Sequence, residues 1–170
     1  MMLTRRTLAI AALSAGCRSV TPQMPSRSAF IDALPMEVAN DVPVDRSALE
    51  GKVVLVTFVA TWCFPCVAEL GALKQLRERF GAAGFVSLLV GMDLEGAAVL
   101  RPFAQAYALQ EPLIVADDRL RSGTTIFGRI RELPSRVLFR RDGTIALAFS
   151  GVVPSERFEA VVRPLLNSDG

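Results

Sequence analysis

Histidine does not occur anywhere in the 170 residues. Its absence removes the group on which most general-base sites and most transition-metal sites are built. Cysteine is also scarce, because Cys17, Cys63 and Cys66 are too few for a fold held together by several disulfides. With 19 basic and 17 acidic residues the chain lacks the basic excess of a nucleic-acid-binding protein.

Internal repeats and low-complexity stretches are absent as well. The length suggests one domain with short extensions, and 51% of the residues are hydrophobic, which is enough to bury a sizeable core. The small net charge of +2 has a local origin, since Arg5 and Arg6 precede every acidic residue of the chain. A chain that had lost its first segment would therefore be close to neutral.

That first segment, MMLTRRTLAIAALSAGCRS, has the layout of an export signal. Arg5 and Arg6 precede an apolar run, residues 8–15, that is far too short to span a bilayer but has the length of a signal-peptide core. The small residues before Cys17 resemble a bacterial lipobox, in which the cysteine becomes the lipidated first residue. An ordinary secretory signal with an incidental Cys17 is the alternative, and the two arginines also resemble a twin-arginine signal.

These features divide the chain into three parts. We predict a signal peptide over residues 1–16, a lipid-anchored tether over 17–40 and a folded domain over 41–170. The tether prediction depends on the scattered prolines and small polar residues of that stretch. Under either signal reading the domain functions outside the cytoplasm, where disulfides persist.

Hydrophobic patterning predicts an α/β domain. KVVLVTFV and FVSLLVGM are near-continuous apolar runs, as in strands buried on both faces. The predicted order is strand 52–59, helix 64–80, strand 85–92, helix 97–108, extended piece 113–115, short helix within 117–127, strands 135–140 and 144–150, and helix 155–166. The sequence RDG between the last two strands is a hairpin signal. We therefore expect a central mixed sheet with helices on both faces.

The helix over 64–80 is predicted to be amphipathic. Apolar residues recur along it with helical spacing, and the charged residues between them form its polar back: Glu69, Lys74, Arg77 and Glu78.

The sequence WCFPC joins the first strand to this helix. Cys63 falls at the helix N-terminus, where unpaired N–H groups and the helix dipole favour a thiolate, the nucleophilic form of cysteine. Cys66 lies one turn later, close enough to form a disulfide with Cys63 and to resolve a mixed disulfide. Pro65 costs little in a first helical turn.

Two other uses of the cysteine pair are open. A zinc site would need two more ligands, and only Cys17 remains among the soft ones. A purely structural disulfide would close so short a loop that it would constrain the unfolded chain very little. Thiol–disulfide exchange is the interpretation that the strand–cysteine–helix arrangement favours.

The stretch VATWCFPCVAELGALKQL resembles the TlpA/ResA-type oxidoreductases, membrane-anchored extracytoplasmic members of the thioredoxin superfamily. The resemblance covers roughly residues 40–167 and implies a thioredoxin-like three-layer sandwich. It implies that Cys63 and Cys66 are catalytic and that Trp62, Phe64 and Pro65 contact the substrate. The alternative for Trp62 is ordinary core packing.

The resemblance also implies a cis-proline loop facing the cysteines, and the sequence ELPS before the strand RVLF matches it. A cis bond at Pro134 would place the backbone of Leu133 beside the sulfurs, where a substrate chain could pair as an added strand. The alternative is a trans turn proline at the start of a strand.

The sequence departs from many thioredoxins at one position. Thr57 stands where they have a buried aspartate that helps to move the proton of the buried thiol. ResA-type proteins also lack that aspartate but carry a glutamate after the next strand, and spacing places Glu95 there. Glu95 could take the proton of Cys66 during resolution, with Asp93 as the substitute. The alternative is that Glu95 is a solvated residue opening a helix.

The expected function is that of an extracytoplasmic thiol–disulfide oxidoreductase, a reductant of disulfides in exported proteins of the cytochrome c maturation type. Its partners would be exported protein thiols or disulfides and a membrane electron donor. We expect a monomer, anchored through Cys17, with no metal, no nucleic acid and no cofactor beyond the Cys63–Cys66 disulfide. Two alternatives stay open: a peroxiredoxin-like peroxidase, for which Thr57 and Thr61 are the threonines available, and a metallochaperone or binding module.

Overall fold

The computed structural model of the protein describes residues 27–168. Its centre is a five-stranded mixed sheet with the strand order β3-β2-β1-β4-β5. The strands are β1 (Val53–Val59), β2 (Phe85–Gly91), β3 (Leu113–Val115), β4 (Ser135–Phe139) and β5 (Ile145–Ser150). β1 pairs in parallel with β2, as β2 does with β3, whereas β4 runs antiparallel to both β1 and β5. The mixed sheet expected from the sequence is confirmed.

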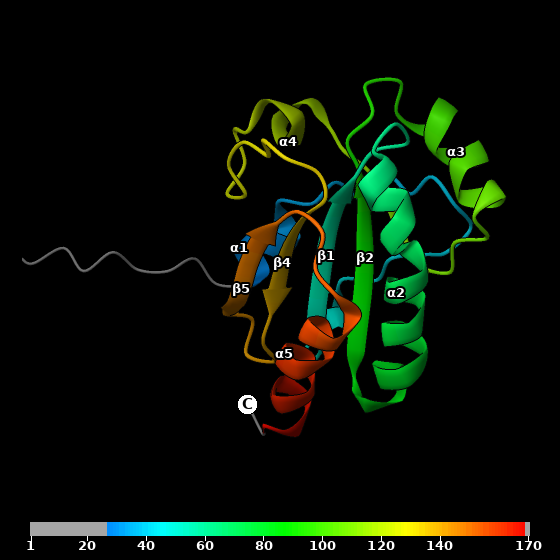
Figure 1. Cartoon of the computed structure of the whole chain (residues 1–170). Helices are drawn as coiled ribbons and strands as arrows, with labels where there is room; N and C mark the ends of the chain where they lie inside the picture. The colour runs from blue at the N-terminus through cyan, green and yellow to red at the C-terminus, as the bar shows by residue number, and fades with distance from the viewer. Residues whose placement is uncertain (1–26, 169–170) are drawn as a thin grey trace, which may run out of the picture.

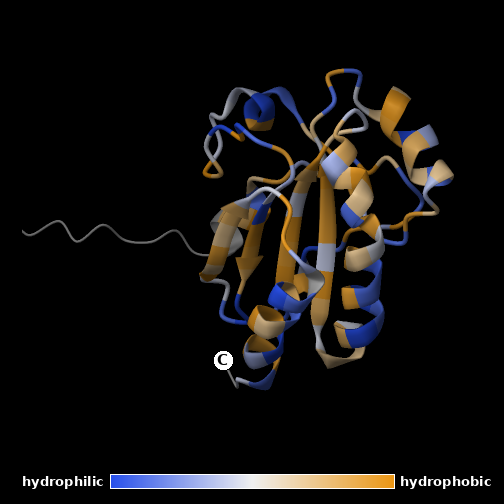
Figure 2. Cartoon of the chain, viewed as in Figure 1, coloured by the Kyte–Doolittle hydropathy of each residue, from blue (hydrophilic) through white to orange (hydrophobic). Residues whose placement is uncertain are grey.

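Helices cover both faces of this sheet, which gives three layers (Figure 1). The long helix α2 (Phe64–Phe80), α3 (Ala97–Ala106) and α5 (Ser155–Asn167) pack on one face. The other face is covered by α1 (Arg27–Asp32), the 3-10 turn η1 (Ser47–Leu49) and α4 (Asp118–Ser122), and a second short 3-10 turn, η2 (Gly81–Ala83), follows α2. Figure 2 shows the central strands as almost uniformly hydrophobic, as strands covered on both faces should be.

The alternation of β1 divides the core into two clusters. Leu55 and Val59 belong to the cluster under α2, α3 and α5, whereas Val56 and Phe58 belong to the cluster under α1 and α4. Every residue of β1 is buried. β1 therefore contributes to both clusters, because successive side chains of a strand point to opposite faces of the sheet.

The N-terminal boundary of the domain differs from the prediction. Residues 27–40 are part of the folded body and not of a tether, because α1 buries Phe30 and Ile31 against the sheet, with Leu34 beside them. The following segment is fixed by a hydrogen bond from Ala39 N to Leu113 O of 2.7 Å. The tether prediction is wrong for these residues, because the apolar residues scattered among the prolines cover a face of β1 and β4. The predicted signal peptide and Cys17 lie outside the described residues.

The other predicted elements occur within a few residues of their expected bounds. The largest difference is the predicted helix within 117–127, which is confined to Asp118–Ser122. Gly123 ends it with a φ of 78°, a left-handed conformation that glycine adopts at low cost. α2 runs through Gly71 without a break.

A cross-strand pair allows the core to be tested with a matched control. Leu138 on β4 faces Leu147 on β5, and the two leucines are 2% and 39% exposed. We expect Leu138→Ala to lower the free energy of unfolding by about 2–5 kcal/mol, because it leaves a cavity in the core. Leu147→Ala should cost less than about 1.5 kcal/mol, since its side chain is partly in water already. Denaturant unfolding of both variants measures the two free energies. Equal losses of stability would contradict the placing of Leu138 in the cluster under α2, α3 and α5.

Candidate active site

The two cysteines lie where β1 gives way to α2. Cys63 is the N-cap residue of the helix, and its sulfur accepts a hydrogen bond from Cys66 N at 3.2 Å. A disulfide joins the pair, with 5.2 Å between the two Cα atoms. Both residues are almost fully buried, at 4% and 2% exposure. The sulfur of Cys63 thus occupies the position where the helix N-terminus favours negative charge.

The loop before β4 lies at the same edge of the sheet. The Leu133–Pro134 peptide bond is cis, the geometry expected from the sequence. Ser135 pairs with Phe58 near the end of β1, so Pro134 lies level with the last residue of that strand. Pro134 O accepts a hydrogen bond from Gly151 N at 2.8 Å, which fixes the loop to the end of β5.

Large apolar side chains project into solvent around the buried cysteines. Trp62 is 73% exposed and Phe64 is 80% exposed, on either side of Cys63. Leu94, in the turn after β2, is 82% exposed. Sequence reasoning missed Leu94, although an isolated leucine between two acidic residues in a turn was a usable signal. We call Trp62, Phe64 and Leu94 the apolar rim.

A buried carboxylate connects the two loops that carry this rim. Asp93 is 2% exposed, and both of its oxygens accept from Thr61 N at 3.1 Å. Its Oδ1 also accepts from Thr61 Oγ1 at 2.6 Å. Hydrogen bonds to an ionised carboxylate are among the stronger ones in proteins. Asp93 therefore fixes the turn that leads into Cys63.

Glu95 lies differently. It is exposed in the turn before α3, and none of the described residues forms a hydrogen bond or ion pair with its carboxylate. Of the two predicted proton acceptors, the structure thus brings Asp93 to the turn before Cys63. The catalytic role of Glu95 stays a prediction.

A buried ion pair joins α2 to β4. Glu69, placed by its sequence on the polar back of the helix, is instead 6% exposed and bonds to Arg136, which is 1% exposed. Burial lowers the pKa of Arg136 from its ordinary value, and the adjacent carboxylate of Glu69 opposes that effect. Arginine keeps its charge under such conditions. The sequence signal for this pair was weak: an arginine inside the apolar run SRVLF.

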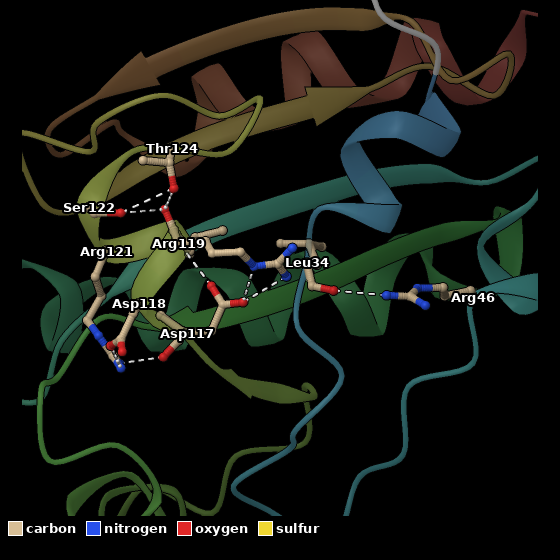
Figure 3. A network of polar contacts seen from close by, with 10 residues as sticks. Leu34, Arg46, Asp117, Asp118, Arg119, Arg121, Ser122 and Thr124 are labelled. Atoms are coloured by element: carbon tan, nitrogen blue, oxygen red, sulfur yellow. Dashed lines mark hydrogen bonds and ion pairs between the residues drawn. The ribbon is translucent and has the colours of Figure 1, made fainter.

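The charges of α4 are also paired, and Figure 3 shows this network from close by. Asp117 caps the helix by accepting from Leu120 N at 2.9 Å and forms an ion pair with Arg119 at 2.8 Å. Arg121 contacts Asp118 at 3.0 Å and donates to Asp93 O at 3.2 Å. Arg121 therefore supports the loop after β2, and both arginines of α4 are paired with aspartates of the same segment.

The sequence of the folded domain matches a known family. The sequence model described as the AhpC/TSA family matches residues 31–148. The chain belongs to the AhpC/TSA family.

Within the described residues, no helix is both long enough and apolar enough to cross a bilayer.

Named relatives agree on one activity. The thiol–disulfide oxidoreductase ResA of Bacillus cereus is 26% identical over 149 residues, covering 80% of this chain and 83% of ResA. ResA of Oceanobacillus iheyensis is 28% identical over 130 residues, covering 76% of this chain and 65% of that protein. Because the chain also carries the paired cysteines that this activity requires, the protein is a thiol–disulfide oxidoreductase.

Solved structures confirm the thioredoxin-like fold. A thioredoxin-family thiol:disulfide interchange protein from Chlorobium tepidum TLS superposes with a TM-score of 0.66 at 22% identity, covering 76% of this chain and 90% of its own. A secreted disulfide oxidoreductase from Mycobacterium tuberculosis gives a TM-score of 0.63 at 17% identity, covering 79% of this chain and 98% of its own.

The hydrogen bonds of Asp93 predict an asymmetry between two nearby acids. Asp93→Ala should lower the free energy of unfolding by about 1–3 kcal/mol, because the partly buried N–H and hydroxyl of Thr61 both lose their acceptor. Glu95→Ala should change it by no more than about 0.5 kcal/mol, as is usual for an exposed residue. Urea unfolding of the two variants gives both values. Equal effects would show that Asp93 does not fix the turn before Cys63.

Proposed function

We propose that the protein is an extracytoplasmic reductant of disulfides in exported proteins, and that it acts through the Cys63–Cys66 dithiol. The observation that supports this most directly is the sulfur of Cys63 at the N-cap of α2, joined to a second cysteine one turn along the same helix. A thiolate at that position is a good nucleophile, and its neighbour is placed to release the product.

The proposed reaction begins with the reduced protein. The Cys63 thiolate attacks one sulfur of the substrate disulfide and forms a mixed disulfide, while the other substrate sulfur leaves as a thiolate. Cys66 then loses its proton and attacks the sulfur of Cys63. This step releases the second substrate sulfur and produces the disulfide seen in the structure. Two electrons have passed to the substrate, so a membrane dithiol donor must return two electrons before the next cycle.

The proton of Cys66 needs an acceptor in this cycle. Glu95 remains the proposed acceptor, and Asp93 is its substitute. Asp93 is already bonded to the turn before Cys63, whereas Glu95 lies exposed in the neighbouring turn. Comparing the resolution step in Glu95→Gln and in Asp93→Asn distinguishes the two carboxylates.

The site favours a polypeptide as the substrate. Three large apolar side chains stand in solvent around cysteines that are almost fully buried. Such a surface gains free energy by covering apolar side chains of a partner. The backbone of Leu133 beside cis-Pro134 would pair with an extended substrate segment, as in strand addition. Pro65 stiffens the turn between the two cysteines from inside the first turn of α2.

Location and anchoring are part of the same proposal. Cys17 would carry the lipid, and the residues from 17 up to α1 would hold the domain near the membrane surface. Cytochrome c maturation is the task that the resemblance of the WCFPC segment suggests, with apocytochrome c cysteines as substrates. The protein would work there as a monomer. The relatives are named thiol–disulfide oxidoreductases, so the comparisons favour neither a peroxidase nor a metallochaperone.

The reduction potential of the Cys63–Cys66 pair tests the direction of electron flow. We expect a value around −270 mV, near that of thioredoxin, when the purified protein is equilibrated with dithiothreitol and glutathione buffers. A tenfold change in the equilibrium corresponds to about 30 mV for this two-electron couple. A value around −120 mV would mean that the protein oxidises its substrates, and the absence of a reversible pair would overturn the exchange activity itself.

The apolar rim predicts a difference between large and small substrates. Leu94→Ala should raise KM for a disulfide-containing polypeptide about tenfold, because about 1.4 kcal/mol of apolar contact is lost. Its rate with a small disulfide such as hydroxyethyl disulfide should stay unchanged.

Leu147→Ala is the control. Leu147 is an exposed leucine within β5, where it pairs with Leu138 and not with the end of β4 that follows cis-Pro134. Steady-state kinetics of both variants with both substrates decides the question. Equal loss with both substrates would remove Leu94 from the docking surface.

A further inference from the structure

The buried ion pair between Glu69 and Arg136 has no part in the reaction described so far. Desolvating two charges is costly, and a buried pair is weak evidence for stability, since apolar replacements of both partners often serve a fold equally well. Arg136 nevertheless stands in β4, where Leu138 and Phe139 are ordinary buried apolar residues. The position of the pair therefore calls for an explanation other than stability.

The pair is close to the cysteines along both elements that carry it. Glu69 follows Cys66 by three residues on the buried side of α2, and side chains with that spacing are neighbours on a helix surface. Arg136 follows cis-Pro134 by two residues and pairs with Thr57 on β1. The ion pair thus connects the helix of the disulfide to the strand of the substrate loop.

Further contacts hold both charges in place. Glu69 Oε1 accepts from Val153 N at 2.9 Å, and Arg136 Nη1 donates to Gly151 O at 2.8 Å. The guanidinium carbon of Arg136 lies 5.5 Å from the ring centroid of Phe149 and 5.1 Å from that of Phe158. Cation–π contacts of this kind stabilise a desolvated cation. Neither charge can turn away to solvent without breaking these bonds.

Two buried polar atoms next to the pair have no partner among the described residues. They are Nε of Arg136 and Oγ1 of Thr57, on residues that face each other across β1 and β4. Thr57 supplies no charge at this place. The charges buried between α2 and β4 are therefore those of Glu69 and Arg136.

We propose that Arg136 is a positioning residue for the cysteine pair, and that it acts by neutralising Glu69 one helical turn from Cys66. With both charges present, their effects on a nearby thiolate oppose one another. An uncompensated carboxylate would disfavour the thiolate, and an uncompensated guanidinium would favour it. Arg136 thus sets how readily the two cysteine thiols ionise. Its bonds also hold α2 against β4, the strand that follows cis-Pro134.

The other charged groups of the surrounding elements lie at the surface. On α2 and α5 the charged side chains other than Glu69 are exposed or half-buried: Lys74, Arg77, Glu78, Arg79, Glu156, Arg157, Glu159 and Arg163. Arg77 also pairs with the buried Glu111, which lies after α3 and contacts the C-terminal half of α2. β5 contributes no charged residue, and β1 contributes none. Asp93 is bonded to Thr61 in the turn before Cys63 and forms no hydrogen bond or ion pair with Glu69 or Arg136, so it is present unchanged in every variant proposed below.

The test measures the pH at which the reduced Cys63 reaches half of its maximal rate of alkylation by iodoacetamide. All proteins are full-length and carry Cys17→Ala, so that only the pair reacts. Arg136→Met should move this pH upward by about one unit, and Glu69→Gln should move it downward by about one unit. The double variant should return to within about 0.3 units of the parent, because both charges are gone.

The opposite signs separate this role from a merely structural one, since general loosening would move both single variants in the same direction. Shifts of the same sign, or no shift in Glu69→Gln, would overturn the proposal. Should Arg136→Met fail to fold, the downward shift of Glu69→Gln and its reversal in the double variant carry the test. The inference rests on the proposed exchange activity only in requiring that the Cys63–Cys66 disulfide can be reduced. Alkylation needs no protein substrate, so failure here and failure of the exchange activity are distinguishable.

Discussion

The pairing of β1 on both of its edges is the constraint on which the rest of the structure depends. β1 runs parallel to β2 and antiparallel to β4, so three chain segments are held in one register by backbone hydrogen bonds. The turn after β1 carries Cys63, the turn after β2 carries Asp93, and the turn before β4 carries cis-Pro134. Because the strands fix one another, the three turns meet at one edge of the sheet.

Side-chain bonds then refine what the sheet brings together. Asp93 fixes the turn before Cys63, and Arg121 of α4 donates to the backbone of Asp93 from the other face of the sheet. Glu69 and Arg136 connect the helix behind the disulfide to the strand behind the proline. Three of these four residues are almost fully buried, so their charges had to be matched by partners within the fold. Bonds among buried residues therefore surround the cysteines, and the largest side chains that the site exposes are the three of the apolar rim.

Much of the fold and of the candidate site could be predicted, because these features depend on short stretches of the sequence. An apolar run followed by WCFPC predicts a buried strand, a helix start and a cysteine at the helix N-terminus, and all three are present. The cis-proline was predicted through the family resemblance, because ELPS before the strand RVLF matches the cis-proline loop of the thioredoxin superfamily. These features depend on neighbours within a few residues, where pattern and propensity are informative.

The features that were missed depend on partners far away in the chain. Glu69 looks like part of a polar helix face until β4 supplies Arg136 beside it, 67 positions later. Residues 27–40 look like a tether until the sheet offers Phe30 and Leu34 a surface to cover. Patterning along one segment cannot show which face another segment will occupy.

The near-complete burial of the two cysteines has a kinetic meaning. An electrophilic disulfide that is hidden behind its own chain cannot be reached by every thiol that collides with the protein. Under the function proposed above, electrons enter through a partner that docks closely enough to open a path to the sulfur. Which thiols exchange with such a disulfide then depends on how well a partner docks, and not only on the difference in reduction potential.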